Sequence, residues 1–286
     1  MKNPLLYFVI LSFLLLTGCA EKDKKNKTTE KKMTHEEVMI KKIADLKAAG
    51  YEIYDYHAHL KGGLTMEELL EHSKKTGIKY GVAFNAGIGF PITNDSTLLA
   101  NYERYKDYPV YLAMQAEGRE WVDMFSKESI ATFDYIFTDA MTWTDKKGRR
   151  MRLWLADEVF VDDKDDFMDQ LVDKIVYVME KEPIDIYVNS TYLPEVLQPE
   201  YDKLWTNKRM DRVIKAAVEN NVAVEINARF KIPSAAFIKR AKAAGVKFSM
   251  GTNNMDKNLG TLDYALKMID ECGLKPGDFF KPKKKH

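Results

Sequence analysis

The sequence predicts an α/β protein, namely a distorted (β/α)7 barrel of the TIM-like type. Three observations support this prediction: short apolar runs recur along the chain, amphipathic segments separate them, and glycines follow several of these segments. Strands that are separated by helices pair in parallel through right-handed crossovers. Seven such units favour a closed or distorted barrel, with an open sheet as the alternative.

The predicted strands are short apolar runs that are rich in β-branched and aromatic residues. They cover residues 51–57, 78–85, 109–115, 133–139, 184–189, 221–227 and 246–251. In a parallel barrel the active site lies at the carboxyl ends of the strands. The polar residues that end these runs are therefore the candidates for function.

Helices are predicted between the strands, over residues 66–76, 162–181, 234–244 and 259–271. Thr65 followed by Glu68 is typical of a capping box before the first of them. Gly77, Gly245 and Gly273 follow helices, where a left-handed residue is expected to end the helix.

The segment 140–160, which follows the fourth predicted strand, is longer than an ordinary connection. A loop of this length in a compact domain is often functional, so the segment is predicted to contribute to the site.

The N-terminal residues have the pattern of a bacterial lipoprotein signal peptide. Residues 1–18 contain Lys2, an apolar run too short for a membrane span, and Leu-Thr-Gly directly before Cys19. Cys19 is the expected lipidation site, which would anchor the protein to the cell envelope, at the outer membrane. An ordinary signal peptide with a chance cysteine is the alternative.

The remaining boundaries follow from composition. Residues 19–33 are predicted to be a flexible tether and residues 281–286 a basic tail, which leaves residues 34–280 as one catalytic βα-barrel domain. Residues 1–33 and 281–286 together contain 11 lysines and 3 acidic residues, so residues 34–280 have 33 basic and 40 acidic residues, a net charge of −7. An acidic domain gives no reason to expect a nucleic-acid partner. Two cysteines exclude a disulfide scaffold.

The first strand supplies the most informative polar residues. Regular alternation would place Asp55, His57 and His59 on one face, with both imidazoles directed inward. Two structural histidines held by hydrogen bonds are the alternative interpretation.

Other strand ends add carboxylates, amides and guanidinium groups. Arg119 and Arg229 are suited to bidentate binding of an anionic substrate group, or they pair only with neighbouring carboxylates. An unpaired buried Glu225 would be costly, so a partner or ligand is expected. The candidate substrate-binding residues are Arg119, Arg229, Asn189, Asn227 and Asn253.

The order of these motifs resembles the polymerase-and-histidinol-phosphatase (PHP) family, within the amidohydrolase-like hydrolases. Residues 55–60 (DYHAHL) resemble its opening metal motif, and Glu117 falls where its bridging carboxylate would lie. Residues 133–141 (FDYIFTDAM) and 248–255 (FSMGTNNM) are similar to two further segments. The resemblance covers about residues 50–280 and implies a distorted seven-stranded barrel.

The departures from the PHP pattern matter more for chemistry than the matches. Met141, Asn189 and Met255 occupy family histidine positions, and Asn253 replaces an aspartate. Methionine and asparagine are poor ligands for hard divalent ions. The remaining metal alternative is one divalent ion (zinc, manganese or similar) held by His57, His59, Glu117 and Glu225.

The residues that remain favour β-elimination on an anionic sugar. An arginine that neutralises a carboxylate makes the adjacent carbon-bound proton easier to remove. His57 or His59 is the expected base, with Tyr187 or Tyr192 as the helper. Exported lipoproteins of this kind resemble accessory enzymes of bacterial polysaccharide utilisation, among them a dehydratase that acts on ulvan oligosaccharides.

The leading hypothesis is therefore a lyase or dehydratase of uronate-containing oligosaccharides such as ulvan fragments. A mono- or dinuclear metal-dependent hydrolase of phosphoesters or amides is the second hypothesis. A non-catalytic surface binding lipoprotein is the third.

Overall fold

The computed structural model describes residues 33–282 and shows a nearly closed barrel of seven parallel strands. The predicted signal peptide 1–18, the lipidation site Cys19 and all but the last residue of the predicted tether 19–33 lie outside the described residues. The strands follow one another around the sheet in chain order: β1 (Tyr54–Ala58), β2 (Lys79–Gly87), β3 (Tyr111–Glu117), β4 (Tyr135–Thr138), β7 (Ile186–Tyr187), β8 (Ala223–Asn227) and β9 (Phe248–Gly251). The predicted seven-stranded TIM-like barrel is confirmed.

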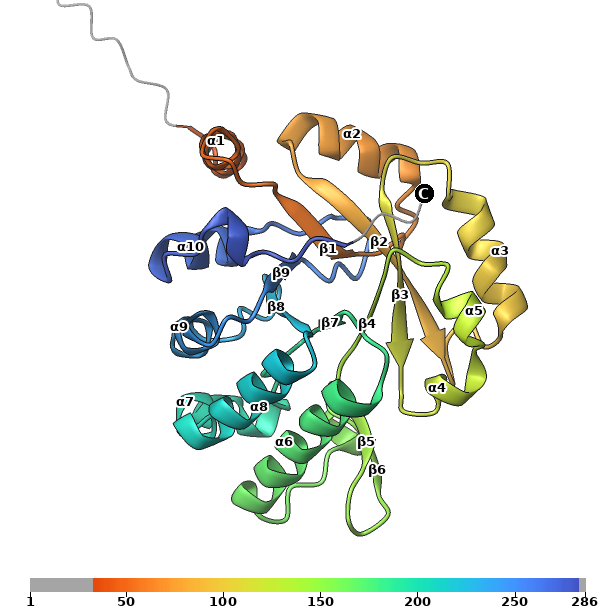
Figure 1. Cartoon of the computed structure of the whole chain (residues 1–286), viewed down its shortest axis with the longest axis vertical. Coiled ribbons are helices and arrows are strands. Elements are labelled where there is room, and N and C mark those ends of the chain that lie inside the picture. The colour runs from red at the N-terminus through yellow and green to blue at the C-terminus, as the bar shows by residue number, and fades with distance from the viewer. Residues whose placement is uncertain (1–32, 283–286) are drawn as a thin grey trace, which may run out of the picture. The chain divides into compact units, whose positions relative to one another are not determined.

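Helices surround this sheet (Figure 1). They are α1 (His35–Ala48), α2 (Met66–Thr76), α3 (Asp95–Tyr105), α4 (Trp121–Met124), α5 (Lys127–Ile130), α6 (Lys164–Lys181), α7 (Tyr201–Leu204), α8 (Asn207–Glu219), α9 (Ala235–Ala243) and α10 (Asp263–Glu271). Short 3-10 turns cover Ala156–Glu158, Glu195–Glu200 and Pro276–Asp278. From His35 onward the described residues group into one compact unit.

The predicted helix signals act as expected at α2. The Thr65 side chain accepts a hydrogen bond from the Glu68 amide, and the Glu68 carboxylate accepts one from the Thr65 amide. Gly77 ends the helix with a φ of 78°, a left-handed conformation that favours glycine. The sequence analysis did not predict α3 and α8, although Asn94 and Thr206 cap their first turns.

The barrel closes between β9 and β1 through side chains as well as backbone. The Asn253 amide donates to the His57 carbonyl at 2.9 Å, and the Thr252 amide donates to the Asp55 carboxylate at 3.1 Å. The Asn254 side chain accepts from the His59 amide and donates to the His59 carbonyl. Asp55 and Asn254 thus satisfy backbone groups that a regular ladder would have paired.

The rings of His57 and His59 lie together as expected, with centroids 5.2 Å apart, but the expectation that Asp55 shares their face is wrong, because β1 contains an irregularity. The β1–β2 register shifts between Asp55 and Ala58. As a result Tyr56 and the next residue, His57, both contact the barrel interior, at Tyr135 and Phe137 respectively. The Asp55 carboxylate instead accepts a hydrogen bond from the His57 amide at 3.0 Å, which stabilises the bulge.

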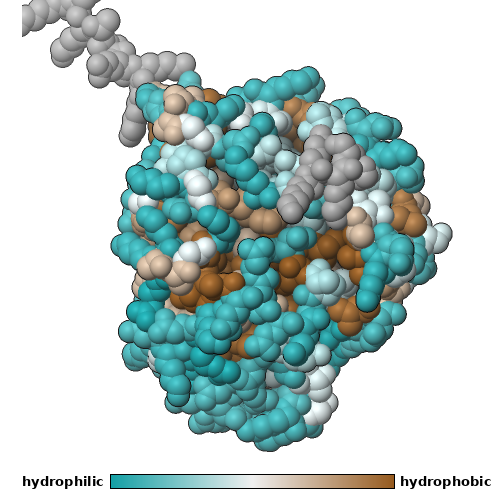
Figure 2. All heavy atoms as spheres, viewed as in Figure 1, coloured by the Kyte–Doolittle hydropathy of each residue, from teal (hydrophilic) through white to brown (hydrophobic). Residues whose placement is uncertain are grey.

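The opposite end of the barrel is filled with aromatic side chains. Tyr56 packs against Tyr135 and Phe280, and the Tyr135 hydroxyl donates to the Tyr56 carbonyl. The predicted basic tail begins at Lys281, whose ammonium group pairs with Glu52 at 2.5 Å. On the face shown in Figure 2, hydrophilic residues dominate the periphery and hydrophobic residues gather toward the middle.

The predicted insertion 140–160 contains an antiparallel hairpin, β5 (Thr142–Thr144) and β6 (Arg150–Arg152). Met151 and Trp143 of this hairpin are buried, whereas Trp154 just beyond it keeps 39% of its surface exposed. Within residues 33–282, no helix is both long and apolar enough to cross a bilayer.

Candidate functional site

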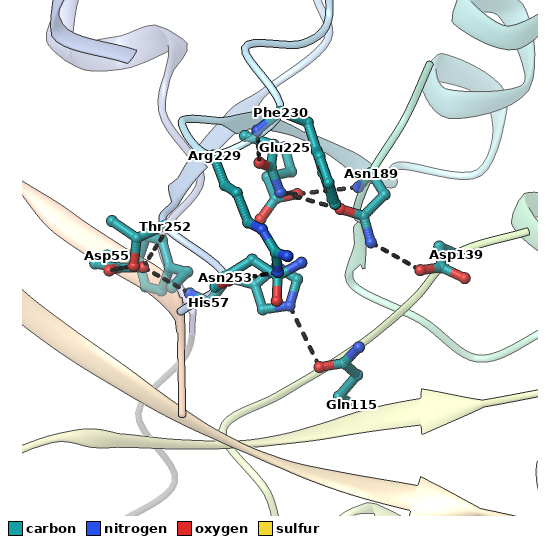
Figure 3. A network of polar contacts seen from close by, with 12 residues as sticks. Asp55, His57, Gln115, Asp139, Asn189, Glu225, Arg229, Phe230, Thr252 and Asn253 are labelled. Carbon is teal, nitrogen blue, oxygen red and sulfur yellow. Dashed lines mark hydrogen bonds and ion pairs between the residues drawn. The ribbon is translucent and has the colours of Figure 1, made fainter. Parts of the chain in front are cut away.

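A buried ion pair between β1 and β8 forms the floor of the site. The Nδ1 atom of His57 lies 2.6 Å from Oε1 of Glu225, and both side chains are 1% exposed. The Nε2 atom of His57 lies 3.3 Å from the carbonyl oxygen of the Gln115 side chain. Figure 3 shows the contact between His57 and Gln115. Both ring nitrogens of His57 thus face an oxygen atom of a neighbouring side chain.

Glu225 is held ionised by its neighbours. Its Oε2 atom accepts from the Asn189 amide and from the Asn227 side chain, each at 2.9 Å. Although burial raises the pKa of this carboxyl group, His57 and these donors outweigh burial and lower it below the usual value. The predicted need of Glu225 for a partner is therefore met within the protein.

The His57–Glu225 pair depends on a close approach of β9. A Cβ atom on Gly251 would lie 2.2 Å from the Glu225 carboxylate and 2.6 Å from the His57 Cβ atom. No side chain fits in that space, so glycine is required where β9 passes behind the pair.

Gln115 connects this ion pair to Glu117 at the end of β3. The amide nitrogen of Gln115 donates to Oε1 of Glu117 at 2.9 Å, and Asn85 donates to the same oxygen at 2.7 Å. Burial and the nearby Asp139 raise the pKa of Glu117 to about 8. Two donors on one oxygen suit a protonated carboxyl group that accepts at Oε1 and keeps its proton on Oε2.

Asp139, after β4, is the second carboxyl group of the site. Burial raises its pKa, but hydrogen bonds from the Met141 amide and the Asn189 side chain oppose that rise. Within residues 33–282, the hydrogen-bond donors to Glu117 are the side chains of Asn85 and Gln115, not backbone amides. Glu117, with a pKa of about 8, is the member of the pair that keeps its proton at neutral pH, and the donors to Asp139 favour the ionised form of that carboxyl group.

A cavity of about 180 Å³ opens above these residues at the carboxyl ends of the strands. Two cations line it: Lys61, which is half-buried, and Arg229, which is exposed. In the described part of the chain, no carboxylate lies within ion-pair distance of either cation. Burial lowers the pKa of Lys61, Glu117 opposes this effect, and Arg229 adds to it. The cavity combines a carboxyl pair with two cations that are available to an anion.

Aromatic and sulfur-containing side chains form the rim of this cavity. Trp154 comes from the insertion, Phe90 follows β2, and Phe230 lies beside the guanidinium of Arg229, 5.0 Å from it. All four positions that depart from the PHP pattern, Met141, Asn189, Asn253 and Met255, also line the cavity. Asn189 and Asn253 adopt left-handed backbone conformations, with φ of 51° and 47°, which asparagine tolerates better than most residues.

Two of the predicted site residues do not reach the cavity. The guanidinium of Arg119 pairs with Glu182 at 2.8 Å and also donates to Thr138 and to the Asp139 carbonyl. The Tyr187 hydroxyl accepts from the Ala140 amide at 2.9 Å, and burial raises its pKa well above the usual value. Both side chains support the strand ends.

The other predicted residues lie in or directly beneath the site. Asn227 is fully buried and holds Asn189 and Glu225. Tyr192 lines an adjoining cavity of about 400 Å³, which shares Arg229 and Phe230 with the first. His59 lines a third cavity, of about 480 Å³, which shares Lys61, Asn85 and Phe90 with the first.

The residues predicted from the sequence did not include Asp139, Lys61, Asn85, Gln115 or the aromatic residues Phe90, Trp154 and Phe230. Asn85, Gln115 and Asp139 end the second, third and fourth predicted strands, so the strand-end rule that selected Glu117 would also have selected them. Lys61 and Trp154 lie in loops, and no pattern in the sequence distinguishes them from other loop residues.

The residues predicted to hold a divalent ion do not converge on a common point. Within residues 33–282, no group of three or more histidine, cysteine, aspartate and glutamate side chains is placed to hold a metal ion. Glu225 and the Nδ1 atom of His57 are directed at each other. Nδ1 of His59 is directed at the Ala83 carbonyl. This donor arrangement does not fit the single-ion site.

No protein-family model matches the chain, and no curated protein matches it. Three solved structures resemble it in part: a variant of the citrate synthase SbnG, an archaeal ribonuclease P with mature tRNA, and a putative mandelate racemase/muconate lactonizing enzyme from Roseovarius nubinhibens ISM complexed with magnesium. The identities are 12%, 15% and 8%, and the TM-scores are 0.36, 0.34 and 0.33.

These matches cover 73%, 79% and 73% of this chain and 91%, 89% and 56% of the three solved chains, respectively. At such TM-scores they carry no argument about function, and neither the PHP family nor an ulvan enzyme is among those three.

Proposed function

We propose that the protein is a lyase or dehydratase that acts by β-elimination on uronic-acid-containing oligosaccharides, such as ulvan fragments. One observation carries the proposal: a pair of neighbouring carboxyl groups shares a cavity with two cations that form no ion pair with a carboxylate of residues 33–282. The reaction needs both features, because it removes a proton beside a carboxylate and protonates a leaving oxygen.

The cations would bind the uronate carboxylate. Arg229 is exposed, and the hydrogen bond that it donates within the described part of the chain is a long one, 3.4 Å to the Asn253 carbonyl. The guanidinium is therefore available for a bidentate contact. Lys61 also lines the cavity and adds a second positive charge. Trp154 and Phe230 offer aromatic surface for the apolar face of a sugar ring.

The carboxyl pair would transfer the protons. Asp139 removes the proton from the carbon beside the uronate carboxylate, and that electron pair forms the new carbon–carbon double bond. The neighbouring carbon–oxygen bond then breaks, and Glu117 gives its proton to the departing oxygen, which leaves as water or as an alcohol. A general acid with a pKa of about 8 remains protonated at neutral pH, as this role requires.

The histidines predicted to act as bases have other roles in this proposal. His57 lies against Glu225, and Gln115 connects it to Glu117, so it positions the acid. Asn189 and Asn227 hold Asp139 and Glu225 in the same network. Tyr192, in the adjoining cavity, remains a candidate for binding the substrate.

The N-terminal pattern supports an extracytoplasmic substrate. A lipid on Cys19 would hold the enzyme at the cell envelope, at the outer membrane, where polysaccharide fragments are encountered. Its membrane partner would be the lipid bilayer, and its substrate partner an anionic oligosaccharide.

The test is a panel of uronate oligosaccharides followed by ultraviolet absorbance, because elimination creates a conjugated unsaturated uronate. Wild-type protein is expected to produce this absorbance with at least one substrate, and Glu117→Gln is expected to abolish it. Glu71→Gln, on the exposed surface of α2, is the matched control and should retain activity.

Three outcomes would overturn the proposal. The absence of new absorbance across the panel, with unchanged substrates by mass spectrometry, would exclude the lyase. Binding without turnover would then favour the non-catalytic surface binding lipoprotein. Phosphoester or amide hydrolysis that depends on added zinc or manganese, and is lost with EDTA, would favour the metal-dependent hydrolase.

A further inference from the structure

The cavity of about 480 Å³ beside the proposed reaction centre is not used by the chemistry above. It lies between β1, β2 and α3 and meets the smaller cavity at Lys61, Asn85 and Phe90. Its volume is within the range of small-molecule binding sites. A ligand in one cavity can therefore extend directly into the other.

His59 gives this cavity a defined hydrogen-bond acceptor. Its Nδ1 atom lies 3.0 Å from the Ala83 carbonyl oxygen, which can only accept, so Nδ1 carries the proton. Burial holds the pKa of His59 well below the usual value, so the ring is neutral and Nε2 has a free lone pair. Nε2 is buried and has no hydrogen-bond partner in the described part of the protein.

An unpartnered buried acceptor is unusual, because leaving one unsatisfied costs about 1–3 kcal/mol. The His59 ring is 1% exposed, and it lines the cavity. A ligand that enters this cavity with a hydroxyl or N–H donor is the candidate partner for Nε2.

The rest of the lining selects the class of ligand. Apart from Lys61 at the shared edge, no charged side chain among residues 33–282 lines the cavity. Asn101 and Thr97 supply uncharged polar groups, and Phe90 and Tyr105 supply aromatic surface. Tyr105 is itself stacked on Phe84, with ring centroids 5.5 Å apart, which fixes this wall. Polar groups without charge beside aromatic rings suit a neutral hydroxylated ring.

We propose that this cavity is a subsite for a neutral sugar unit linked to the uronate in the smaller cavity, and that Nε2 of His59 accepts a hydrogen bond from one of its hydroxyls. The inference rests on the proposed function, and it specifies the substrate. The substrate is at least a disaccharide, with its acidic unit between Lys61 and Arg229 and its neutral unit against His59.

The experiment compares two ligands by isothermal titration calorimetry: glucuronic acid, and a disaccharide in which a neutral sugar is joined to glucuronic acid. Wild-type protein is expected to bind the disaccharide about tenfold more tightly or better. His59→Leu should remove that advantage and leave glucuronic acid binding unchanged. His59→Gln, which retains an acceptor oxygen, should restore part of it. His35→Leu, at an exposed histidine of α1, is the matched control.

Equal affinity of the wild type for the two ligands would overturn the subsite and leave the lyase proposal standing. An equal loss of both ligands in His59→Leu would also overturn it. Asn101→Ala provides a second variant if His59→Leu does not fold. Should added zinc bind at His59 and compete with the disaccharide, His59 would be a metal ligand and the subsite proposal would fail.

A neutral probe separates this inference from the lyase. Saturation-transfer NMR with methyl glycosides of neutral sugars should show contact in the wild type and a clear loss in His59→Leu. Contact of this kind without any uronate turnover would refute the lyase alone. No contact with any methyl glycoside would refute the subsite, whatever the uronates do.

Discussion

Replacing Glu117 with glutamine is expected to inactivate the enzyme and, at the same time, to stabilise it at alkaline pH. Both donors to Glu117, Asn85 and Gln115, bind the same oxygen, Oε1. A glutamine can place its carbonyl oxygen there and its amide group at the position of Oε2. Glu117→Gln therefore resembles the protonated form of Glu117 and preserves the network.

The magnitude follows from the difference between the folded and unfolded pKa. The pKa of Glu117 is raised from 4.5 to about 8, mainly by burial. Below pH 4.5 both states are protonated and the group contributes no pH dependence. Between these values the unfolded chain releases the proton and the folded protein does not, so wild-type stability falls by about 1.4 kcal/mol per pH unit relative to the variant. The difference between pH 5 and pH 8 is about 4 kcal/mol.

The assay is urea denaturation of the wild type and of Glu117→Gln at pH 5, 7 and 8, with Glu71→Gln as the control. We expect the unfolding free energy of Glu117→Gln, relative to the wild type, to rise steadily with pH. Parallel stability curves for the two proteins across this range would refute the reasoning, because they would show that Glu117 titrates alike in both states.

Other substitutions test separate parts of the account. Arg229→Ala is expected to raise KM for uronates about tenfold with little effect on kcat, because it removes a contact made in both the ground state and the transition state. An unchanged KM would show that Arg229 does not bind the uronate carboxylate. Arg119→Ala is expected to lower the unfolding free energy by about 3 kcal/mol in urea denaturation, because Glu182 then stays buried without its cationic partner and keeps the Trp121 side chain as a donor. KM should not change. A raised KM at full stability would show that Arg119 binds substrate. Asp55→Ala is expected to lower the unfolding free energy by roughly 2–4 kcal/mol, because the amides of His57 and Thr252 lose their acceptor. A variant as stable as the wild type would contradict the role of Asp55 in the β1 bulge.

Much of the barrel could be predicted because its signals are local. The capping box at Thr65 and the glycine at Gly77 define α2 by themselves, and each predicted strand overlaps an observed one. The helices α3 and α8 were missed, although caps at Asn94 and Thr206 mark them. Chain order around a parallel sheet then brings the strand ends together, which is why Glu117, Asn189 and Arg229 could be placed in one site.

The errors arose where tertiary contacts override the local pattern. Regular alternation assigns Asp55 and His57 to one face, but the bulge redirects Asp55 to the backbone of β1 and β9. Arg119 follows Glu117 at the spacing of one face, yet the buried Glu182 of a distant helix end attracts its guanidinium. The position of Lys61 depends on the loop after β1, which no periodicity describes.

The account depends on a carboxyl group that keeps its proton at neutral pH beside two available cations. The most direct test is a titration of the side-chain carboxyl carbon of Glu117 by NMR, with Glu117→Gln identifying the resonance. The account predicts a midpoint near the pKa of about 8. A midpoint near the ordinary value of 4.5 would contradict it, because Glu117 would then be ionised at neutral pH and could not protonate the leaving oxygen.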